Sequence, residues 1–97
     1  MTSQTNIFPR YRVHPHAAHR CVGGEIFVVT DDRAFHRLLP GTAVDVFQAV
    51  VAGTTDAMAL AKLIAERYEV AGDRAATDIR SFLDDLVSRR VLEREPT

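Results

Sequence analysis

Residues 72–92 read GDRAATDIRSFLDDLVSRRVL, and this stretch decides the fold. Its apolar residues recur at helical spacing, which predicts one long amphipathic helix that stops just before the apolar pair Val91-Leu92. At about 100° per residue, the apolar stripe of this helix spans roughly 140°, wider than the ~100° that a surface helix needs. Either the stripe buries one broad face, or one of its edges is left to line a binding groove.

The two edges of the predicted helix carry different side chains. With Ile79 at the centre of the stripe, Ala75, Phe82 and Leu86 lie to one side, and Ala76, Leu83, Val87, Arg80 and Asp84 lie to the other. We expect Ile79, Phe82 and Leu86 to fill the core. The second edge, rimmed by Arg80 and Asp84, would then line the groove.

The chain before this helix predicts a three-stranded antiparallel meander and two shorter helices. Turns at Gly23-Gly24 and Asp31-Asp32-Arg33 separate three runs that favour strands. The predicted strands cover residues 19–22, 25–30 and 34–38, and the predicted helices cover 42–52, about 56–68, and 73–90. Three strands followed by three helices is an α+β order, and the last two helices have the helix-turn-helix arrangement.

Size and composition predict one small domain outside the membrane. The chain has 97 residues, of which 46% are hydrophobic and 26% charged, and a formal net charge of -1. No run approaches the roughly 20 apolar residues that cross a bilayer, and none near the N-terminus suits a signal peptide. The net charge gives no overall attraction to nucleic acid or acidic lipid, and Cys21 has no cysteine partner for a disulfide. We therefore expect a cytoplasmic protein that binds neither nucleic acid nor membrane.

Both faces of the predicted sheet are apolar, although a sheet with one wet face should alternate cleanly. Phe27, for example, points to the opposite face from Val28. Two ways of covering the second face stay open. The N-terminal arm is one, through Ile7, Phe8 and Tyr11, and a second copy of the protein in a homodimer is the other. The arm is favoured because it belongs to the same chain.

No residue pattern predicts catalysis or a metal centre. His14, His16, His19 and Cys21 lie close together, but their spacing matches no paired CxxC or HExxH motif, so a solvated arm is the favoured interpretation. Cys21 also lacks a catalytic partner at a recognisable spacing. The chain contains no phosphate-binding loop, dinucleotide fingerprint or nucleophile elbow. The sequence therefore predicts a non-enzyme without a cofactor.

Residues 20–93 resemble the PqqD family, the peptide-recognition domains of pathways that make ribosomally synthesised and post-translationally modified peptides (RiPPs). The resemblance is carried, in order, by VGGEIFVVTDDRAFHRL (22–38), Gly41-Thr42-Ala43, Gly53-Thr54-Thr55-Asp56, LAKLIAERYEV (60–70) and DIRSFLDDLVSRRVLE (78–93). The chain departs from the family at Leu39, where Asn is common, and at Ala71-Gly72, where Asp-Pro is common. The departures remove possible caps of the first and third helices and leave the groove untouched.

The resemblance implies a fold similar to a winged helix-turn-helix and a RiPP recognition element that binds the leader of a precursor peptide. The leader would add a strand to residues 34–38 and dock its side chains against the third helix. The domain would span residues 20–94, after a basic, partly disordered arm (1–19) and before a tail (95–97). The implied peptide-binding residues are Ala34, Phe35, His36, Arg37, Leu38, Ala76, Ile79, Arg80, Leu83, Asp84 and Val87.

Such an adaptor would present the precursor to a modifying enzyme such as a radical-SAM protein, a cyclase or a leader protease. Arg37 and Arg80 would suit acidic side chains of the leader. The alternative function is a winged-helix DNA-binding protein that reads DNA with its third helix. That helix carries four aspartates against four arginines, whereas phosphate contacts dominate DNA affinity. A scaffold domain without peptide binding is the third possibility.

Overall fold

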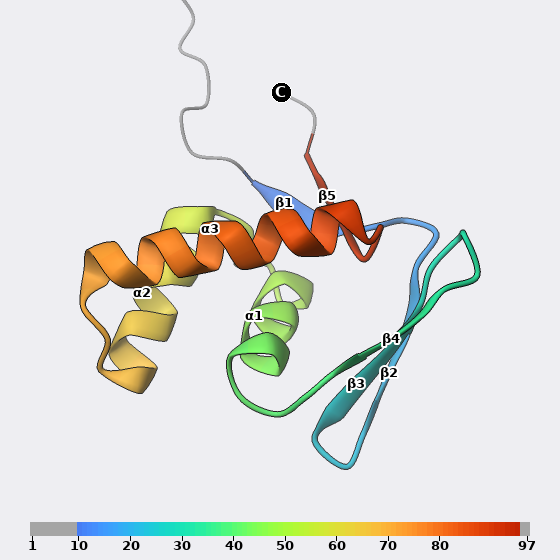
Figure 1. The fold of residues 1–97 in the computed structure, drawn as a ribbon, viewed down its shortest axis with the longest axis horizontal. Helices are drawn as coiled ribbons and strands as arrows, with labels where there is room; N and C mark the ends of the chain where they lie inside the picture. The colour runs from blue at the N-terminus through green and yellow to red at the C-terminus, as the bar shows by residue number, and fades with distance from the viewer. Residues whose placement is uncertain (1–9, 96–97) are drawn as a thin grey trace, which may run out of the picture.

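Residues 10–95, which the computed structural model describes, form two small sheets and three helices (Figure 1). In chain order the elements are β1 (Tyr11–Val13), β2 (Ala18–Val22), β3 (Glu25–Val29), β4 (Phe35–Leu38), α1 (Thr42–Val51), α2 (Ala57–Tyr68), α3 (Gly72–Ser88) and β5 (Leu92–Arg94). The antiparallel sheet β2-β3-β4 precedes the helices. The predicted α+β class, a three-stranded meander followed by three helices, is therefore confirmed.

Two tight turns build the meander. Gly23 and Gly24 join β2 to β3 with φ angles of 60° and 81°, the positive values that a two-residue antiparallel hairpin needs. Between β3 and β4 the backbone N–H of Thr30 donates to the carbonyl of Ala34 at 3.0 Å. Arg33 completes this turn with φ 68°, a conformation that favours glycine or asparagine. The second turn thereby sets how β4 pairs with β3.

The N-terminal strand β1 pairs with the C-terminal strand β5 and not with the meander. Tyr11 lies opposite Arg94, is 0% exposed and belongs to the hydrophobic core. The expectation that Tyr11 covers the second face of the meander is therefore wrong. Pairing with β5 satisfies the backbone hydrogen bonds of β1 and places the Tyr11 ring in the core. This position buries the whole ring, which a place on the meander surface would not do. Ile7 and Phe8, the other residues of that expectation, lie outside the described residues.

The outer face of the meander, turned away from the helices, is exposed. Among residues 10–95, its apolar side chains remain open to solvent, with Phe35 65% and Val22 52% exposed. The rings of Phe27 and Phe35 stack on this face with centroids 5.8 Å apart. The homodimer that would cover this face stays a prediction.

The helices begin as the sequence predicts. Asp56 caps α2, because its carboxylate accepts hydrogen bonds from the backbone N–H groups of Met58 (2.7 Å) and Ala59 (3.3 Å). Helices α1 and α3 follow Gly41 and Ala71, neither of which supplies a side-chain cap. This absence agrees with the two departures from the family pattern.

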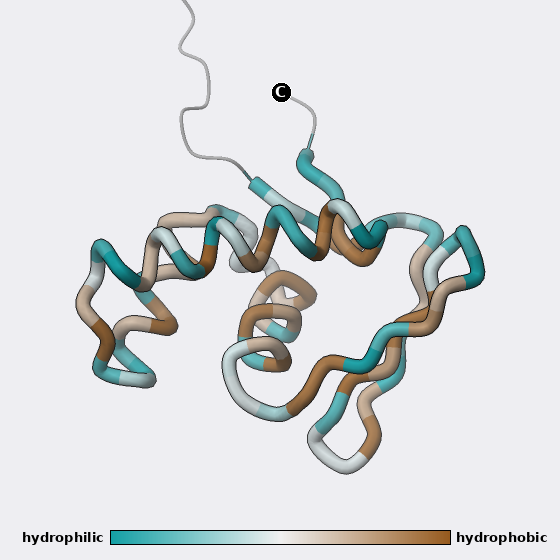
Figure 2. Tube along the Cα trace, viewed as in Figure 1, coloured by the Kyte–Doolittle hydropathy of each residue, from teal (hydrophilic) through white to brown (hydrophobic). Residues whose placement is uncertain are grey.

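The core lies between the inner face of the meander, the β1–β5 pair and the three helices. Figure 2 shows hydrophobic residues concentrated on α1 and alternating with hydrophilic ones along α3. The largest fully buried side chains are Tyr11, Phe47, Ile26, Leu60, Ile79, Leu83, Leu86, Leu92, Val28, Val46 and Val91. The predicted apolar end Val91-Leu92 is thus part of this core, beyond a left-handed residue, Arg90, that ends α3 with φ 65°.

Candidate peptide-binding site

Strand β4 is an edge strand of the meander. The sheet order is β2-β3-β4, and within residues 10–95 no strand pairs with the outer edge of β4. An unpaired edge presents backbone N–H and C=O groups that another extended segment can bind. Within residues 10–95 the outer edges of β4 and of β2 are therefore both open to strand addition.

The hydrogen-bond pattern identifies which backbone groups of β4 point outward. In an antiparallel pair, successive residues of a strand bond alternately to one side and to the other. The Thr30–Ala34 hydrogen bond fixes the phase, so His36 and Leu38 bond to β3. The N–H and C=O groups of Phe35 and Arg37 consequently point to the outer edge. These two residues offer four backbone groups to an added strand.

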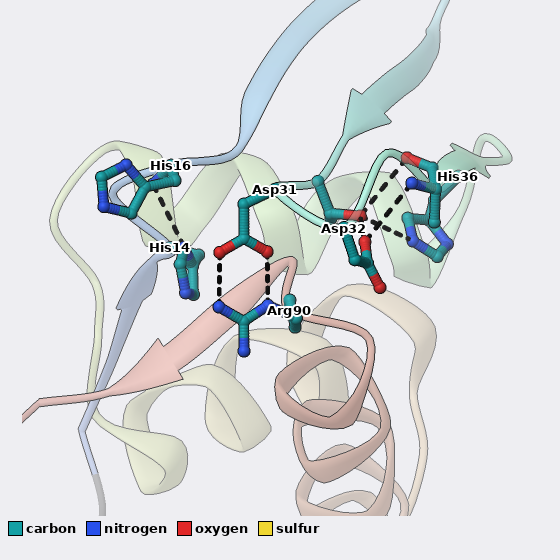
Figure 3. A network of polar contacts seen from close by, with 8 residues as sticks. His14, His16, Asp31, Asp32, His36 and Arg90 are labelled. Carbon is teal, nitrogen blue, oxygen red and sulfur yellow. Dashed lines mark hydrogen bonds and ion pairs between the residues drawn. The ribbon is translucent and has the colours of Figure 1, made fainter.

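Residues of α3 and its C-terminal end lie near the segments that precede and follow β4 in the sequence. Just beyond its C-terminal end, the guanidinium of Arg90 forms a two-pronged ion pair with the carboxylate of Asp31, in the β3–β4 turn (Figure 3). Further along the helix, Phe82 lines a cavity together with Thr42 and Ala43, the first residues of α1, which follows β4 in the chain. In the view of Figure 1, α1 lies below α3 and to the left of β4.

A cavity of about 410 Å³ opens where α1 begins, beside the Phe82 edge of α3. Its walls are mainly apolar and come from the three helices and the α2–α3 connection: Thr42, Ala43, Ile64, Tyr68, Val70, Ala75, Ile79 and Phe82, with Asp78 among its polar lining. The hydroxyl of Tyr68 donates to the carboxylate of Asp45, which raises the pKa of Tyr68 and keeps it a neutral donor. The cavity suits a large apolar side chain.

The predicted site residues on β4 divide between the two faces of the sheet. His36 and Leu38 face inward, with His36 Nε2 3.5 Å from the hydroxyl of Thr30 and Leu38 buried. Phe35 and Arg37 face outward, where the guanidinium of Arg37 donates to Glu25 at 2.7 Å. Ala34 precedes the strand, in the turn. The structure therefore brings the four strand residues to one edge, with alternating directions.

Ile79 and Leu86 are buried as expected, but Phe82 and Leu83 differ in burial from what the sequence suggested. Leu83, expected to line the groove, is 0% exposed and belongs to the core, and its contact with a peptide stays a prediction. Phe82, expected to fill the core, is only partly buried and lines the cavity. Ile79 lies between them, buried but also at the cavity wall.

The remaining predicted residues of α3 lie on the side away from the cavity. Asp84 accepts hydrogen bonds from Arg94 in β5 (2.6 Å) and from the Tyr11 hydroxyl (3.5 Å). Ala76 lines a second cavity, about 490 Å³, against α2. Arg80 is exposed, and Val87 packs against the core. Asp84 is the member of the Ala76–Arg80–Asp84 row that contacts β5, a strand that the sequence did not predict, and contact of the row with a peptide stays a prediction.

The ion pair between Arg90 and Asp31 lowers the pKa of the aspartate. The hydrogen bonds from Arg90 lower the pKa of Asp31 from 3.8 to about 2, and nearby His14 and His16 act in the same direction (Figure 3). A hydrogen bond from the Thr30 hydroxyl lowers the pKa of Asp32 as well. Both carboxylates are therefore charged at neutral pH. This pair, which links sequence positions 59 apart, was not predicted, because no local pattern relates its members.

Of the four arginines in residues 72–90, Arg74 and Arg89 pair with acids of the same segment, and Arg90 pairs with Asp31. Arg74 lies 3.7 Å from Asp78, and Arg89 lies 3.0 Å from Asp85. These pairs leave little cationic surface on the helix that the DNA alternative would use for reading. In the described part of the chain, no three His, Cys, Asp or Glu side chains are grouped to hold a metal ion. None of the helices within residues 10–95 has the length and apolarity to span a bilayer.

Comparison with known proteins identifies the family. The sequence model of the family described as Coenzyme PQQ synthesis protein D (PqqD) matches residues 35–92, more than half of the chain. The chain belongs to the PqqD family. Membership implies involvement in PQQ-type RiPP biosynthesis, and the family is a non-catalytic accessory family. The matched region runs from the first residue of β4 to the first residue of β5, so it contains the edge strand and all three helices.

Two further comparisons add no relative. No curated protein and no solved structure matches the chain.

Proposed function

We propose that this PqqD-family protein is a non-catalytic adaptor that binds the leader of a precursor peptide. The leader adds a strand to the outer edge of β4, and its inward side chains lie between β4 and the Phe82 edge of α3. The observation that carries this proposal is the pair of outward backbone positions, Phe35 and Arg37, on a strand edge that is unpaired within residues 10–95. Backbone hydrogen bonds supply affinity without regard to sequence, and the cavity supplies selectivity for an apolar side chain.

Bound in this way, the leader leaves the rest of the precursor accessible to a modifying enzyme, such as a radical-SAM protein, a cyclase or a leader protease. Holding precursor and enzyme on one carrier raises the effective concentration of one for the other, without any chemistry by the adaptor. The proposal therefore requires binding surfaces and no catalytic group.

A pair of variants tests whether the backbone of β4 is the binding element. Arg37→Thr and Arg37→Pro both remove an exposed guanidinium, but only the proline variant also removes the outward N–H. The β3–β4 ladder uses His36 and Leu38, so both variants keep it. We expect the affinity for the leader of a precursor encoded beside this gene to fall at least about tenfold further in Arg37→Pro than in Arg37→Thr.

The measurement is isothermal titration of each variant, with backbone amide spectra to confirm the fold and locate the shifts. Shifts at residues 35–38 and around Phe82 support the proposal. Equal affinity of the two variants, or shifts confined to the Ala76 side of α3, would show that the leader binds elsewhere.

A further inference from the structure

Phe35 is a large aromatic side chain that is exposed to solvent at the edge of the sheet. It is 65% exposed and stacks on Phe27, with ring centroids 5.8 Å apart and planes at 29°. The stack fixes the ring flat on the outer face, in a position that loses little side-chain freedom when another group covers it. The rest of the ring is open to solvent among residues 10–95.

The backbone phase decides which side chains of an added strand would meet this face. Side chains of directly opposed residues lie on the same face of a sheet, whichever direction the new strand runs. Phe35 and Arg37 face outward, so the two leader residues opposite them also face outward. Only the leader residue opposite His36 and its alternate neighbours turn inward to α3. Half of a bound leader would therefore be recognised outside the groove.

Arg37 makes this outer face selective for charge. Its Nε and Nη2 atoms donate to Glu25, at 2.7 and 3.3 Å, and Nη1 keeps donors for a second carboxylate. Arg20, on the same row as Phe27 and Arg37, forms no ion pair within residues 10–95. The outer face carries two arginines, Arg20 and Arg37, against one glutamate, Glu25, which favours an acidic partner over a second copy of the same face.

We propose that Phe35 and Arg37 read the leader peptide from the outer face of the meander. The leader carries an aromatic or β-branched residue opposite Phe35 and, two positions away, an acidic residue opposite Arg37. This inference rests on the proposed strand addition. It specifies two residues of the leader that contact with α3 alone would not specify.

The test begins with a random library of 12-residue peptides displayed on phage and selected on the wild-type protein. A selected peptide is then synthesised and titrated into wild type, Phe35→Thr and the control Val22→Thr. Val22 is exposed on the same face but lies on β2, the strand at the opposite edge. We expect about threefold to fivefold weaker binding for Phe35→Thr and unchanged binding for Val22→Thr, the size of a lost cross-strand pair.

A second selection uses Arg37→Glu. We expect its peptides to replace the acidic residue by lysine or arginine at the position two residues from the aromatic or β-branched one. The same acidic preference in both selections would overturn the inference.

The outcomes separate this inference from the proposed function. If Phe35→Thr binds as wild type does while the amides of β4 still shift, outer-face reading is wrong and strand addition stands. If no selected peptide shifts the amides of β4, both fail. If sedimentation shows a wild-type dimer that Phe35→Thr abolishes, a second copy occupies the face and the inference is overturned.

Discussion

At the scale of single residues, two arginines have backbone conformations that are unfavourable for residues with a side chain. Arg33 and Arg90 adopt left-handed conformations, with φ 68° and 65°, where glycine is usually found. Arg90 uses its side chain to hold Asp31. Arg33 has no ion pair in the described part of the chain, so its conformation has no evident side-chain compensation.

Replacing Arg33 by glycine is expected to stabilise the protein by about 0.5–1 kcal/mol. Glycine removes the strain of a left-handed residue, which costs an L side chain roughly 1–2 kcal/mol, and part of that gain is lost to its greater unfolded-state freedom. Urea unfolding of Arg33→Gly beside Arg33→Ala checks this, because alanine removes the side chain but keeps the strain. Equal stabilities of the two variants would contradict it.

Leu83 belongs to the core. We expect Leu83→Ala to lower the free energy of unfolding by about 2–5 kcal/mol, the cost of a cavity at a fully buried leucine. Met58→Ala, at an exposed position of another helix, is expected to change it by less than about 0.5 kcal/mol. Thermal or urea denaturation checks both, and a stable Leu83→Ala would contradict the place of Leu83 in the core.

At the scale of elements, the contact between the β3–β4 turn and the end of α3 is an ion pair with a pH-dependent contribution. The pKa of Asp31 is lowered from 3.8 to about 2, chiefly by hydrogen bonds from Arg90. A carboxyl whose folded pKa is depressed stabilises the fold above its unfolded pKa and loses that effect as the pH falls through the folded value. The window is therefore between about pH 4 and pH 2.

Asp31→Asn is expected to be less stable than wild type at pH 6, with the difference shrinking as the pH falls to 2.5. The reason is that Asp31 is then mostly protonated in the unfolded chain, so folding must release a proton to form the ion pair, which cancels much of its contribution. Urea midpoints at the two pH values measure the effect, and the side-chain carbon resonance of Asp31 gives its pKa directly. A difference that is independent of pH would exclude the ion pair as its source.

The edge strand β4 is expected to show alternating amide exchange. In the protein alone, the outward amides of Phe35 and Arg37 exchange quickly, while those of His36 and Leu38 are protected by β3. Adding a strand-forming leader peptide should protect the first pair and leave the second unchanged. Hydrogen exchange followed by NMR resolves the four amides, and protection without alternation would contradict the pairing phase.

At the scale of the whole molecule, the two terminal strands are as much part of the fold as the meander. Tyr11 places a complete aromatic ring in the core from a segment that composition alone marks as a basic arm. Tyr11→Ala is expected to cost about 3–5 kcal/mol of stability, and Tyr11→Phe less than about 1, because the hydroxyl makes only one long hydrogen bond at 3.5 Å. Denaturation curves of the two variants decide whether β1 is structural.

The sequence was sufficient to predict the meander and the three helices, but not which neighbour each side of α3 packs against. Periodicity places Ile79 at the centre of the α3 stripe, and the structure buries it there. Phe82 and Leu83 are neighbours of equal apolar character, about 100° apart on the helix, so only the partners of each edge can assign their roles. Those partners are α1 on one side and β5 on the other. A three-residue strand with the charged residues Glu93 and Arg94 carries no periodic signal by which to predict it.

The pairing of β1 with β5 has a consequence for how the protein is connected to others. It brings Arg10 and Glu95 together, with a backbone hydrogen bond of 2.9 Å and a side-chain ion pair of 3.2 Å. This junction lies on the Asp84 edge of α3, opposite the edge that faces the cavity. A polypeptide fused before residue 10 or after residue 95 would therefore be tethered on the Asp84 side of α3, away from that cavity. A short linker joining the two ends would make a circular permutant opened at Gly23-Gly24 feasible.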